Sequence, residues 1–571
     1  MTHELLFILF AVALCPPEAL AQPSPDSVFP PDSDVRKLLV QRIDEYRQSV
    51  GIVAGVIEPN GRRIVAYGAL DKGDPRPLDG NTVFEIGSVT KVFTALALAD
   101  MAHRGEVSLS DPVAKYLPAD VKVPRRGDRQ ITLENLAAQT SGLPRMPSSF
   151  KPKDPANPYA DYTADLLYQF LSGYELPRDI GSQYEYSNLG FGLLGHALAR
   201  RAGTDYESLV LAHICQPLGL ANTRITLSSE MKARMAVGHN EKLERVAGFD
   251  FQALAGAGAL RSNANDMLTF LAAAMGTAPS PLADSFAALL KVRVPAGIPG
   301  MQGALGWQVS NRGNGEIVWK DGGTYGYAAF IGYDPKRRVG VVLLSNSFTM
   351  SGTVTGVSDI GLHLLDPLFP LNGPPEEHHE VSVDPKILSG YAGRYQLTAN
   401  MVLNLTVEDA HLMMQPTGQP KLELFPESEK DFFTKIGGIR IAFQTDGKGR
   451  ATSLNLRQGG ATLHAPRIEG DAPPPAKKEH KEISLDPAVL DRYVGRYQLA
   501  ATFILSITRQ ESHLYVQATG QPKFEIFAEA EKDFFLKDVD AQITFATDDR
   551  GKVTELVLHQ NGAHQTAKRI E

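Results

Sequence analysis

The second half of this chain repeats itself. DPKILSGYAGRYQL begins at residue 384, and DPAVLDRYVGRYQL begins 102 residues later, at residue 486. QPTGQPKLELFPESEKDFF returns at the same offset as QATGQPKFEIFAEAEKDFF, and both copies close on RIE. Two segments this similar must share one fold, so at least two structural units of the 571-residue chain are copies of each other.

Each copy is built from short runs in which apolar and polar residues alternate, such as VLNLTVED, HLMMQ, KLELF and RIAFQTD. Gly, Pro, Asp or Asn separates these runs. A period of two with frequent turn residues is typical of short antiparallel strands. We therefore expect residues 384–469 and 486–571 each to form a small all-β barrel domain.

The segments that precede the two copies, LNGPPEEHHEVSVDP and EGDAPPPAKKEHKEISLDP, are rich in proline and charge and lack periodicity. This composition predicts linkers. Their histidines, His378, His379 and His480, have no partners at ligand spacing, so solvated linker is favoured over a metal site. The repeated YxGRY phrases could form a ligand site, but their identical strand context favours a structural corner. Their residues are Tyr391, Arg394, Tyr493 and Arg496.

Residues 33–370 mix helical and strand patterns. VRKLLVQRIDEYRQSV predicts an amphipathic helix, and GIVAGVIEPNGRRIVAYG predicts a hairpin that turns at Asn60-Gly61. Near the other end, YAAFIGYDPKRRVGVVLLSNS predicts two strands around Asp334-Pro335, followed by a helix. The fold expected here is α/β, with an antiparallel sheet assembled from both ends of the segment.

The first residues predict export. LLFILFAVALC is too short to span a bilayer, and the small residues of Ala19-Leu20-Ala21 fit signal cleavage, so residues 1–21 are a predicted signal peptide. The alternative, lipid attachment at Cys15, would require the bulky Leu14 before the modified residue. After cleavage Cys215, an expected core residue, remains alone and no internal disulfide can form. A net charge of −8 with 21% charged residues offers no basic surface for nucleic acid.

The stretch FEIGSVTKVFTALALADM, residues 84–101, places Ser88 and Lys91 where a glycine turn meets a long apolar run. Two further SxxK tetrapeptides, at Ser148 and Ser229, lack this context. Residues i and i+3 share a face of a helix, so Lys91 would lie beside the Ser88 hydroxyl in apolar surroundings that disfavour an ammonium. We interpret Ser88 as a nucleophile and Lys91 as its proton acceptor. The alternative, a serine that only caps a core helix, does not explain a buried lysine.

A second candidate motif is GSQYEYSNLGFGLLGHAL, in which Tyr186 and Asn188 stand between a loop and an apolar helical run. With cations nearby, Tyr186 could take the Ser88 proton and return it to the leaving group. The Asn188 amide would hold the lysine or the substrate amide. Loop packing is the alternative for this motif taken alone.

A third candidate is Lys320-Asp321-Gly322-Gly323, expected at the beginning of an edge strand that could pair with an extended substrate. Its glycines, Gly322 and Gly323, would let another backbone approach closely. Lys320 would attract a substrate carboxylate, and the N–H groups of Ser88 and Gly323 would form an oxyanion hole. Taken alone, KDGG is as compatible with a hairpin turn.

SxxK, YxN and KxG in this order resemble the motif set of penicillin-recognising serine hydrolases. The resemblance covers about residues 35–350 and is to the branch containing class C β-lactamases, D-Ala-D-Ala carboxypeptidases, D-aminopeptidases and related esterases. AAQTSGLPR, GAGALRSNANDMLTFL and VGVVLLSNS add to it. It implies a β-lactamase-like α/β fold, with an antiparallel sheet flanked by helices and an all-helical half.

The resemblance also implies roles for individual residues. Ser88 would be the acylated nucleophile and Lys91 with Tyr186 the proton-handling pair. The substrate-binding residues would be Asn188, Lys320 and Gly322, and Gly323 would be the second oxyanion donor. The duplicated tail resembles lipocalin-like barrels of D-aminopeptidase-type members, which can border the cleft and restrict substrate size.

One position departs from the family pattern. Asp321 replaces the threonine of the KTG motif and could neutralise Lys320, although many relatives with such a tail carry His instead of this lysine. We expect an exported serine hydrolase that acts through an acyl-enzyme on β-lactams or peptides containing D-amino acids. A carboxylesterase and a penicillin-binding sensor with slow turnover are alternatives. The expected partner is a small-molecule or peptide substrate, with no metal or organic cofactor.

Overall fold

The computed structural model describes residues 27–570 apart from short internal gaps. The gaps are residues 297–299, 312–314, 352–353, 375–377, 399–400, 417–420, 435–438, 459–460, 470–481, 501–502, 519–522, 537–540, 549–550 and 561–562. The predicted signal segment with Cys15, and His480, therefore lie outside the described residues. Within them, no helix combines the length and the apolar character needed to cross a membrane.

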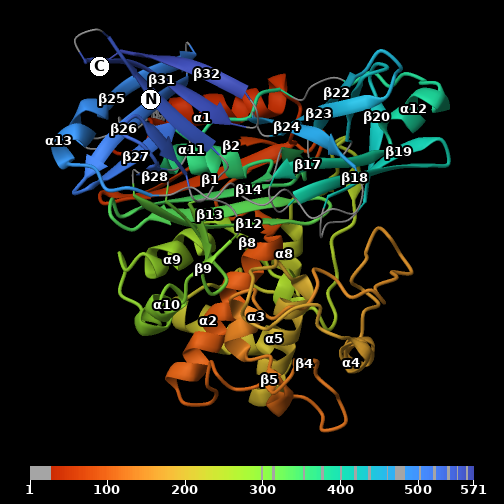
Figure 1. Cartoon of the computed structure of the whole chain (residues 1–571). Coiled ribbons are helices and arrows are strands. Elements are labelled where there is room, and N and C mark those ends of the chain that lie inside the picture. Colours follow the sequence, from red (N-terminus) through yellow and green to blue (C-terminus); the bar gives the residue numbers. More distant parts are fainter. Residues whose placement is uncertain are drawn as a thin grey trace, which may run out of the picture.

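An eight-stranded antiparallel sheet organises the N-terminal part of the chain (Figure 1). Its strands, in spatial order, are β2 (Gly61–Gly68), β1 (Gly51–Glu58), β14 (Val339–Ser345), β13 (Ala328–Asp334), β12 (Glu316–Gly323), β11 (Gln308–Asn311), β10 (Met301–Gly303) and β9 (Val294–Pro295). β1 pairs with β14, with Ile52 opposite Ser345. The expectation of a sheet made from both ends of this segment is confirmed.

Helices cover both faces of this sheet. On one face α1 (Asp32–Val40) and α11 (Ser358–Leu365) pack against an apolar cluster that includes Val35, Phe330 and Ile360. On the other face α9 (Ala264–Ala274) contacts β1 and β14. With both faces covered, every residue of β13 and β14 is buried, which explains why these strands read as continuous apolar runs.

The second face of the sheet continues into an all-helical half (Figure 1). Its helices include α2 (Thr90–His103), α3 (Leu133–Ala137), α4 (Ala164–Gly173), α5 (Asn188–Ala202), α6 (Tyr206–Val210) and α10 (Ala283–Leu289). Local capping sets several of their ends. The Ser187 hydroxyl accepts from the Gly190 N–H at the start of α5, and Gly203 ends that helix in the left-handed conformation.

Two closed antiparallel barrels follow. The first contains β17 (Gly393–Thr398), β18 (Met401–Glu408), β19 (His411–Pro416), β20 (Leu422–Pro426), β21 (Asp431–Phe433), β22 (Arg440–Thr445), β23 (Ala451–Gln458) and β24 (Ala461–Ile468). The second contains β25 (Gly495–Ala500), β26 (Phe503–Gln510), β27 (His513–Ala518), β28 (Lys523–Ala528), β29 (Asp533–Phe535), β30 (Ala541–Thr547), β31 (Val553–Gln560) and β32 (Ala563–Arg569). A short helix precedes each barrel, α12 (Pro385–Tyr391) and α13 (Pro487–Leu490). The fold class expected from the duplication is confirmed.

The tyrosines of the YxGRY phrases have structural roles. The Tyr391 hydroxyl donates to the Glu429 carbonyl at 2.9 Å, and the Tyr395 hydroxyl donates to the Tyr391 carbonyl at 2.7 Å. The second barrel repeats both bonds, from Tyr493 and Tyr497, at 2.8 and 2.9 Å. The interpretation of these tyrosines as a structural corner is therefore confirmed.

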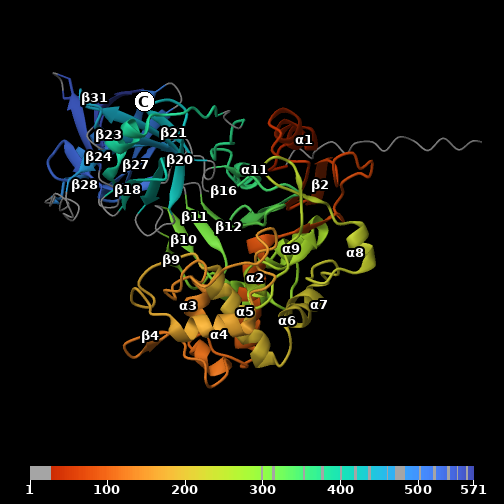
Figure 2. The same cartoon turned by 90° about the vertical axis from the view of Figure 1, so that its right-hand side faces the viewer.

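One linker prediction was wrong. His378 is not solvated but half-buried, because its ring stacks on Phe433 with centroids 4.0 Å apart and lies 3.2 Å from a Glu427 carboxylate oxygen. The end of the first linker is also fixed to the first barrel, because the Val381 N–H donates to the Pro426 carbonyl. Both views place the barrels on the side of the sheet away from the helical half (Figures 1 and 2).

Candidate active site

Ser88 lies in a single 3-10 turn, η2 (Gly87–Val89), between the short strand β3 (Val83–Glu85) and helix α2. Every residue of α2 from Thr90 to Met101 is buried, as the apolar run predicts, whereas Ser88 itself is partly exposed. Neither η2 nor α2 has a side-chain cap hydrogen bond. Ser88 therefore does not act as a helix cap, and its hydroxyl is available to other groups.

Lys91 is fully buried one turn after Ser88. Its Nζ lies 3.0 Å from Ser88 Oγ, 2.8 Å from Asn188 Oδ1 and 2.6 Å from the Ala257 carbonyl oxygen. The last two oxygens can only accept. A neutral Lys91 amine has two N–H groups, which would donate to Asn188 Oδ1 and to the Ala257 carbonyl oxygen. Its lone pair would then point to Ser88 Oγ. Burial lowers the pKa of Lys91 to about 8, so the neutral form is accessible near physiological pH.

Tyr186 faces the same serine, with its hydroxyl 2.5 Å from Ser88 Oγ. Three cationic groups surround its ring, with Lys91 Nζ at 4.9 Å, Lys320 Nζ at 5.3 Å and Arg145 Cζ at 4.9 Å from the centroid. Burial alone would raise the pKa of Tyr186, but Lys91 and Lys320 outweigh it and lower that pKa to about 8. Lys91 and Tyr186 each affect the pKa of the other, so the two groups gain and lose protons as a pair.

Asn188 opens α5, and its amide serves the lysine. Besides accepting from Lys91, the side chain donates to the Tyr159 hydroxyl at 3.4 Å. Its backbone N–H donates to the Arg145 carbonyl at 3.0 Å, which joins the start of α5 to the loop that follows α3. Of the two roles expected for the Asn188 amide, the structure has the one in which it holds the lysine.

The position of the KDGG motif differs from the expectation. Lys320-Asp321-Gly322-Gly323 ends β12 rather than beginning it, because the apolar residues before Lys320 already belong to the strand. β12 is also internal, since it lies between β13 and β11. The pairing of β11 with β12, however, ends at Trp319. In the described pairing, the four residues of the motif therefore pair with β13 only.

The glycines of this motif lie against the nucleophile turn. A Cβ added to Gly322 would meet the Ile86 carbonyl oxygen at 2.1 Å, and one added to Gly87 would meet the Gly323 nitrogen at 2.6 Å. Only glycine permits this backbone contact. The end of β12 and the nucleophile turn are therefore in close backbone contact: a Cβ on Gly322 would also lie 2.8 Å from the Ser88 nitrogen.

Lys320 is buried and already has an anionic neighbour. Its Nζ lies 3.1 Å from Asp321 Oδ1. Burial favours the neutral amine, but Tyr186 and Asp321 outweigh it and raise the pKa of Lys320. The lysine therefore remains an ammonium, and Asp321 neutralises part of its charge as the sequence suggested.

Sequence reasoning missed two contributors to this site. Arg145, in the phrase AAQTSGLPR, was taken as family resemblance only, yet its guanidinium stacks on Tyr186. The Ala257 carbonyl accepts from Lys91 and belongs to the GAGAL segment, where no side chain signals such a role. The available signal for Arg145 was its position directly after the turn residues of SGLP. For Ala257, which acts through its backbone carbonyl, the sequence offered no signal.

The other candidate residues are either exposed or part of the core. Ser148 and Ser229, of the two further SxxK tetrapeptides, are exposed together with their lysines. Cys215 is buried, donates to the Thr223 carbonyl and is a core residue as expected. Within the described residues no group of three His, Cys, Asp or Glu side chains could hold a metal ion.

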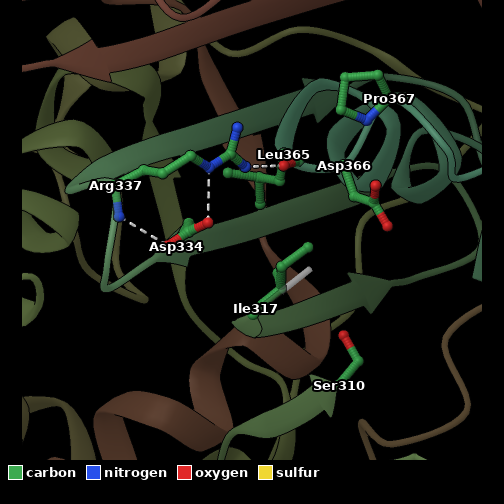
Figure 3. A pocket seen from close by; sticks show the side chains of 8 residues that line it. Ser310, Ile317, Asp334, Arg337, Leu365, Asp366 and Pro367 are labelled. Atoms are coloured by element: carbon green, nitrogen blue, oxygen red, sulfur yellow. Dashed lines mark hydrogen bonds and ion pairs between the residues drawn. The ribbon is translucent and has the colours of Figure 1, made fainter. Parts of the chain in front are cut away.

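A cavity of about 190 Å³ lies near the beginning of β12, at the opposite end of this strand from Gly323 (Figure 3). Two of its charged lining residues, Arg337 and Asp334, form an ion pair. Arg337 donates to Asp334 at 2.7 Å and to the Leu365 carbonyl, both drawn as dashed lines in Figure 3. This cavity is separate from the Ser88 cluster.

Two family models match this chain. A family model described as Beta-lactamase matches residues 37–357, and a model described as a domain of unknown function (DUF3471) matches residues 377–469 and 479–569. The D-alanyl-D-alanine-carboxypeptidase/endopeptidase AmpH of Escherichia coli is 29% identical over 62% of this chain and 95% of its own length. Penicillin-binding protein 4* of Bacillus subtilis is 28% identical over 71% of this chain and 92% of its own.

A Beta-lactamase of Pseudomonas fluorescens is 28% identical over 55% of this chain and 94% of its own length. Among solved structures, a beta-lactamase/D-alanine carboxypeptidase from Yersinia pestis complexed with citrate aligns with 55% of this chain and 93% of that chain, at 28% identity and a TM-score of 0.49. The beta-lactamase model spans more than half of the 571 residues and contains the whole Ser88 cluster. The chain therefore belongs to the beta-lactamase family.

Proposed function

We propose that this protein is a serine hydrolase that forms an acyl-enzyme through Ser88 on the amide bond of a β-lactam or of a peptide containing D-amino acids. The observation that carries the proposal is the contact of both Lys91 Nζ and the Tyr186 hydroxyl with Ser88 Oγ, at 3.0 and 2.5 Å. A nucleophile with a proton acceptor in hydrogen-bond reach is the arrangement that acyl transfer requires.

In the proposed reaction Ser88 Oγ attacks the substrate carbonyl carbon while its proton passes to the Lys91–Tyr186 pair. The N–H groups of Ser88 and Gly323 stabilise the oxyanion that develops. The C–N bond then breaks, and Tyr186 returns the proton to the leaving nitrogen. Water, deprotonated by the same pair, attacks the Ser88 ester and releases the acid, which restores the serine.

Two features support amide substrates. The relatives named above include a D-alanyl-D-alanine-carboxypeptidase/endopeptidase and a Beta-lactamase, both named for reactions at amide bonds. An amide also needs protonation of its leaving nitrogen, and Tyr186, with a pKa lowered to about 8, is suited to both accept and donate a proton near neutral pH.

The test is the intact mass of the purified protein after mixing with a chromogenic cephalosporin, with hydrolysis followed in the same sample. Ser88→Ala should abolish both adduct and hydrolysis while the protein stays folded by circular dichroism. The matched control is Ser229→Ala, which removes the serine of an exposed SxxK tetrapeptide and should change neither.

The outcomes separate the candidate activities. Rapid hydrolysis with little adduct indicates a β-lactamase, and a lasting adduct with slow turnover indicates a peptidase or a penicillin-binding sensor. If no adduct forms, D-alanyl peptides and short acyl esters are tried next. Hydrolysis of esters alone would identify a carboxylesterase and refute the amide proposal, and full activity of Ser88→Ala would refute the site.

We also propose that the enzyme works outside the cytoplasm, on the basis of the apolar segment and Ala19-Leu20-Ala21 in residues 1–21. N-terminal sequencing of the protein recovered from its native cells tests this. A mature chain beginning at Gln22 is expected, and a chain that retains residues 1–21 would refute cleavage.

A further inference from the structure

Arg145 occupies an unusual position beside the nucleophile. Arg145 is exposed, and its guanidinium carbon lies 4.9 Å from the centroid of the Tyr186 ring. The hydroxyl of this tyrosine contacts Ser88. One aromatic ring thus separates this cation from the reacting serine. The Arg145 backbone is held in place, because its carbonyl accepts from the N–H groups of Asn188 and Leu189 at the start of α5.

The charge of Arg145 lowers the pKa of Lys91, but no carboxylate of the described residues pairs with it. Other arginines of the chain pair with carboxylates, as Arg126 does with Asp179 and Arg261 with Glu85. Among the described residues, Arg145 has no such ion pair, and its recorded side-chain contact is the Tyr186 ring. A planar guanidinium that stacks on an aromatic ring keeps its N–H donors free at its edge, where they suit a carboxylate.

The other cations of the site are less suited to bind an anion. Lys91 is fully buried, and its Nζ donates to Asn188 Oδ1 and to the Ala257 carbonyl. Lys320 has only 5% of its side chain exposed and is paired with Asp321, whose own carboxylate, 19% exposed, would repel an approaching anion. Arg145 is therefore the cation of this cluster that is both exposed and unneutralised.

We propose that Arg145, rather than Lys320, binds an anionic group of the substrate, a carboxylate near the scissile amide. This inference rests on the proposed function and specifies its substrate: an amide or peptide that carries a free carboxylate close to the bond cleaved. Arg145 is thus a specificity-determining residue that contacts substrate directly, while the transferred proton moves between Ser88, Lys91 and Tyr186.

The test compares kcat/KM for two matched substrate pairs in the full-length protein. The first pair, succinyl-D-alanine p-nitroanilide and its succinamoyl analogue, differs only in a carboxylate on the acyl part. The second pair, acetyl-D-Ala-D-Ala and its C-terminal amide, differs only in a carboxylate on the leaving part. The pair that responds to Arg145 locates the carboxylate.

Arg145→Gln should lower kcat/KM for the charged member of one pair by about 10-fold or more, the effect of losing a hydrogen bond to a charged group. The neutral member makes no such bond, and Arg145→Gln affects it only through the pKa of Lys91, so it should lose clearly less activity than the charged member. Arg145→Lys should retain part of the preference. Arg126→Gln, which alters another exposed arginine of the helical half, is the control and should leave the preference unchanged.

Asp321→Asn tests the step that concerns Lys320. Added to Arg145→Gln, it should restore part of the activity on the charged substrate, because it frees the Lys320 charge. The proposal is overturned if the charged and neutral substrates lose activity equally, or if Arg145→Gln leaves the preference intact. Turnover of the neutral substrates with no effect of Arg145→Gln overturns this inference alone. Failure of these four substrates and of the chromogenic cephalosporin to acylate Ser88 overturns the proposed function with it.

Discussion

Gly322 lies directly against the backbone of Ser88. A Cβ at Gly322 would be 2.8 Å from the Ser88 nitrogen and 2.1 Å from the Ile86 carbonyl oxygen, closer than side-chain atoms approach a backbone. The end of β12 and the nucleophile turn are therefore in contact through main-chain atoms alone. Any displacement of one changes the position of the other.

Gly322→Ala should reduce kcat/KM by about 100-fold, because a misplacement of about 1 Å in a reacting group can cost this much. The protein should still fold, since the added methyl group displaces only a single turn. Gly173→Ala, at a helix end with no atom within 4 Å of the added Cβ, is the control. Steady-state kinetics of both variants check the prediction, and unimpaired activity of Gly322→Ala would contradict the contact.

The pH dependence of activity should report the Lys91–Tyr186 pair. Activity requires the pair to have lost a proton, so kcat/KM should rise with pH to a plateau above about pH 8, the value to which both pKa values are lowered. The ammonium of Lys320 lowers the pKa of both groups. Lys320→Met should therefore shift the rising limb to higher pH.

A pH–rate profile of wild type and Lys320→Met on a neutral amide substrate checks this shift without involving substrate charge. Arg36→Met, which removes an exposed cation near Tyr67 and away from the site, serves as control and should leave the limb in place. A shift to lower pH in Lys320→Met would show that the sign assigned to this charge is wrong.

The buried ion pair of Arg42 and Asp359 should be essential to stability. Both residues are less than 4% exposed, Nη2 and Oδ2 lie 2.7 Å apart, and the pair joins the N-terminal helical segment to α11. Arg42→Met leaves a buried carboxylate unpaired and should cost about 3–5 kcal/mol of unfolding free energy. Lys37→Met, which breaks the exposed Lys37–Asp34 pair, should cost about 1 kcal/mol or less. Urea unfolding, monitored through the loss of activity, measures the free energy of unfolding of both variants.

The tyrosine corners should stabilise each barrel separately. Tyr395→Phe removes a buried hydroxyl that donates to the Tyr391 carbonyl, and should cost the first barrel about 1 kcal/mol. Tyr497→Phe should have the same effect on the second barrel. Hydrogen exchange followed by mass spectrometry resolves the two barrels by their peptides. Equal loss of protection in both barrels from one substitution would contradict their independence.

Several features could be predicted because their signals are local. Ser88 and Lys91 share one helix, so their separation of three residues already implies the contact seen between Nζ and Oγ. The barrel strands follow from alternation along each run. The neutralisation of Lys320 by Asp321 involves adjacent residues and was likewise accessible.

The errors and omissions arise where distant segments meet. KDGG was expected at the beginning of an edge strand, because its glycines give no sign of which strands flank it. His378 was assigned to solvent, because nothing near it in sequence shows that Phe433 stacks on its ring. Arg145 reaches Tyr186 across a loop and a helix, and neither residue alone predicts this contact.

The sequence by itself determined the types of element, the duplication of the barrel and the serine, lysine and tyrosine that form the candidate site, because periodicity, repeats and motif spacing are properties of contiguous residues. Only the tertiary structure decided the order of the strands, the position of KDGG at the end of an internal strand, and the gathering of Lys91, Lys320 and Arg145 around Tyr186. Those relationships depend on which buried surfaces pack together, and packing joins residues that the chain holds far apart.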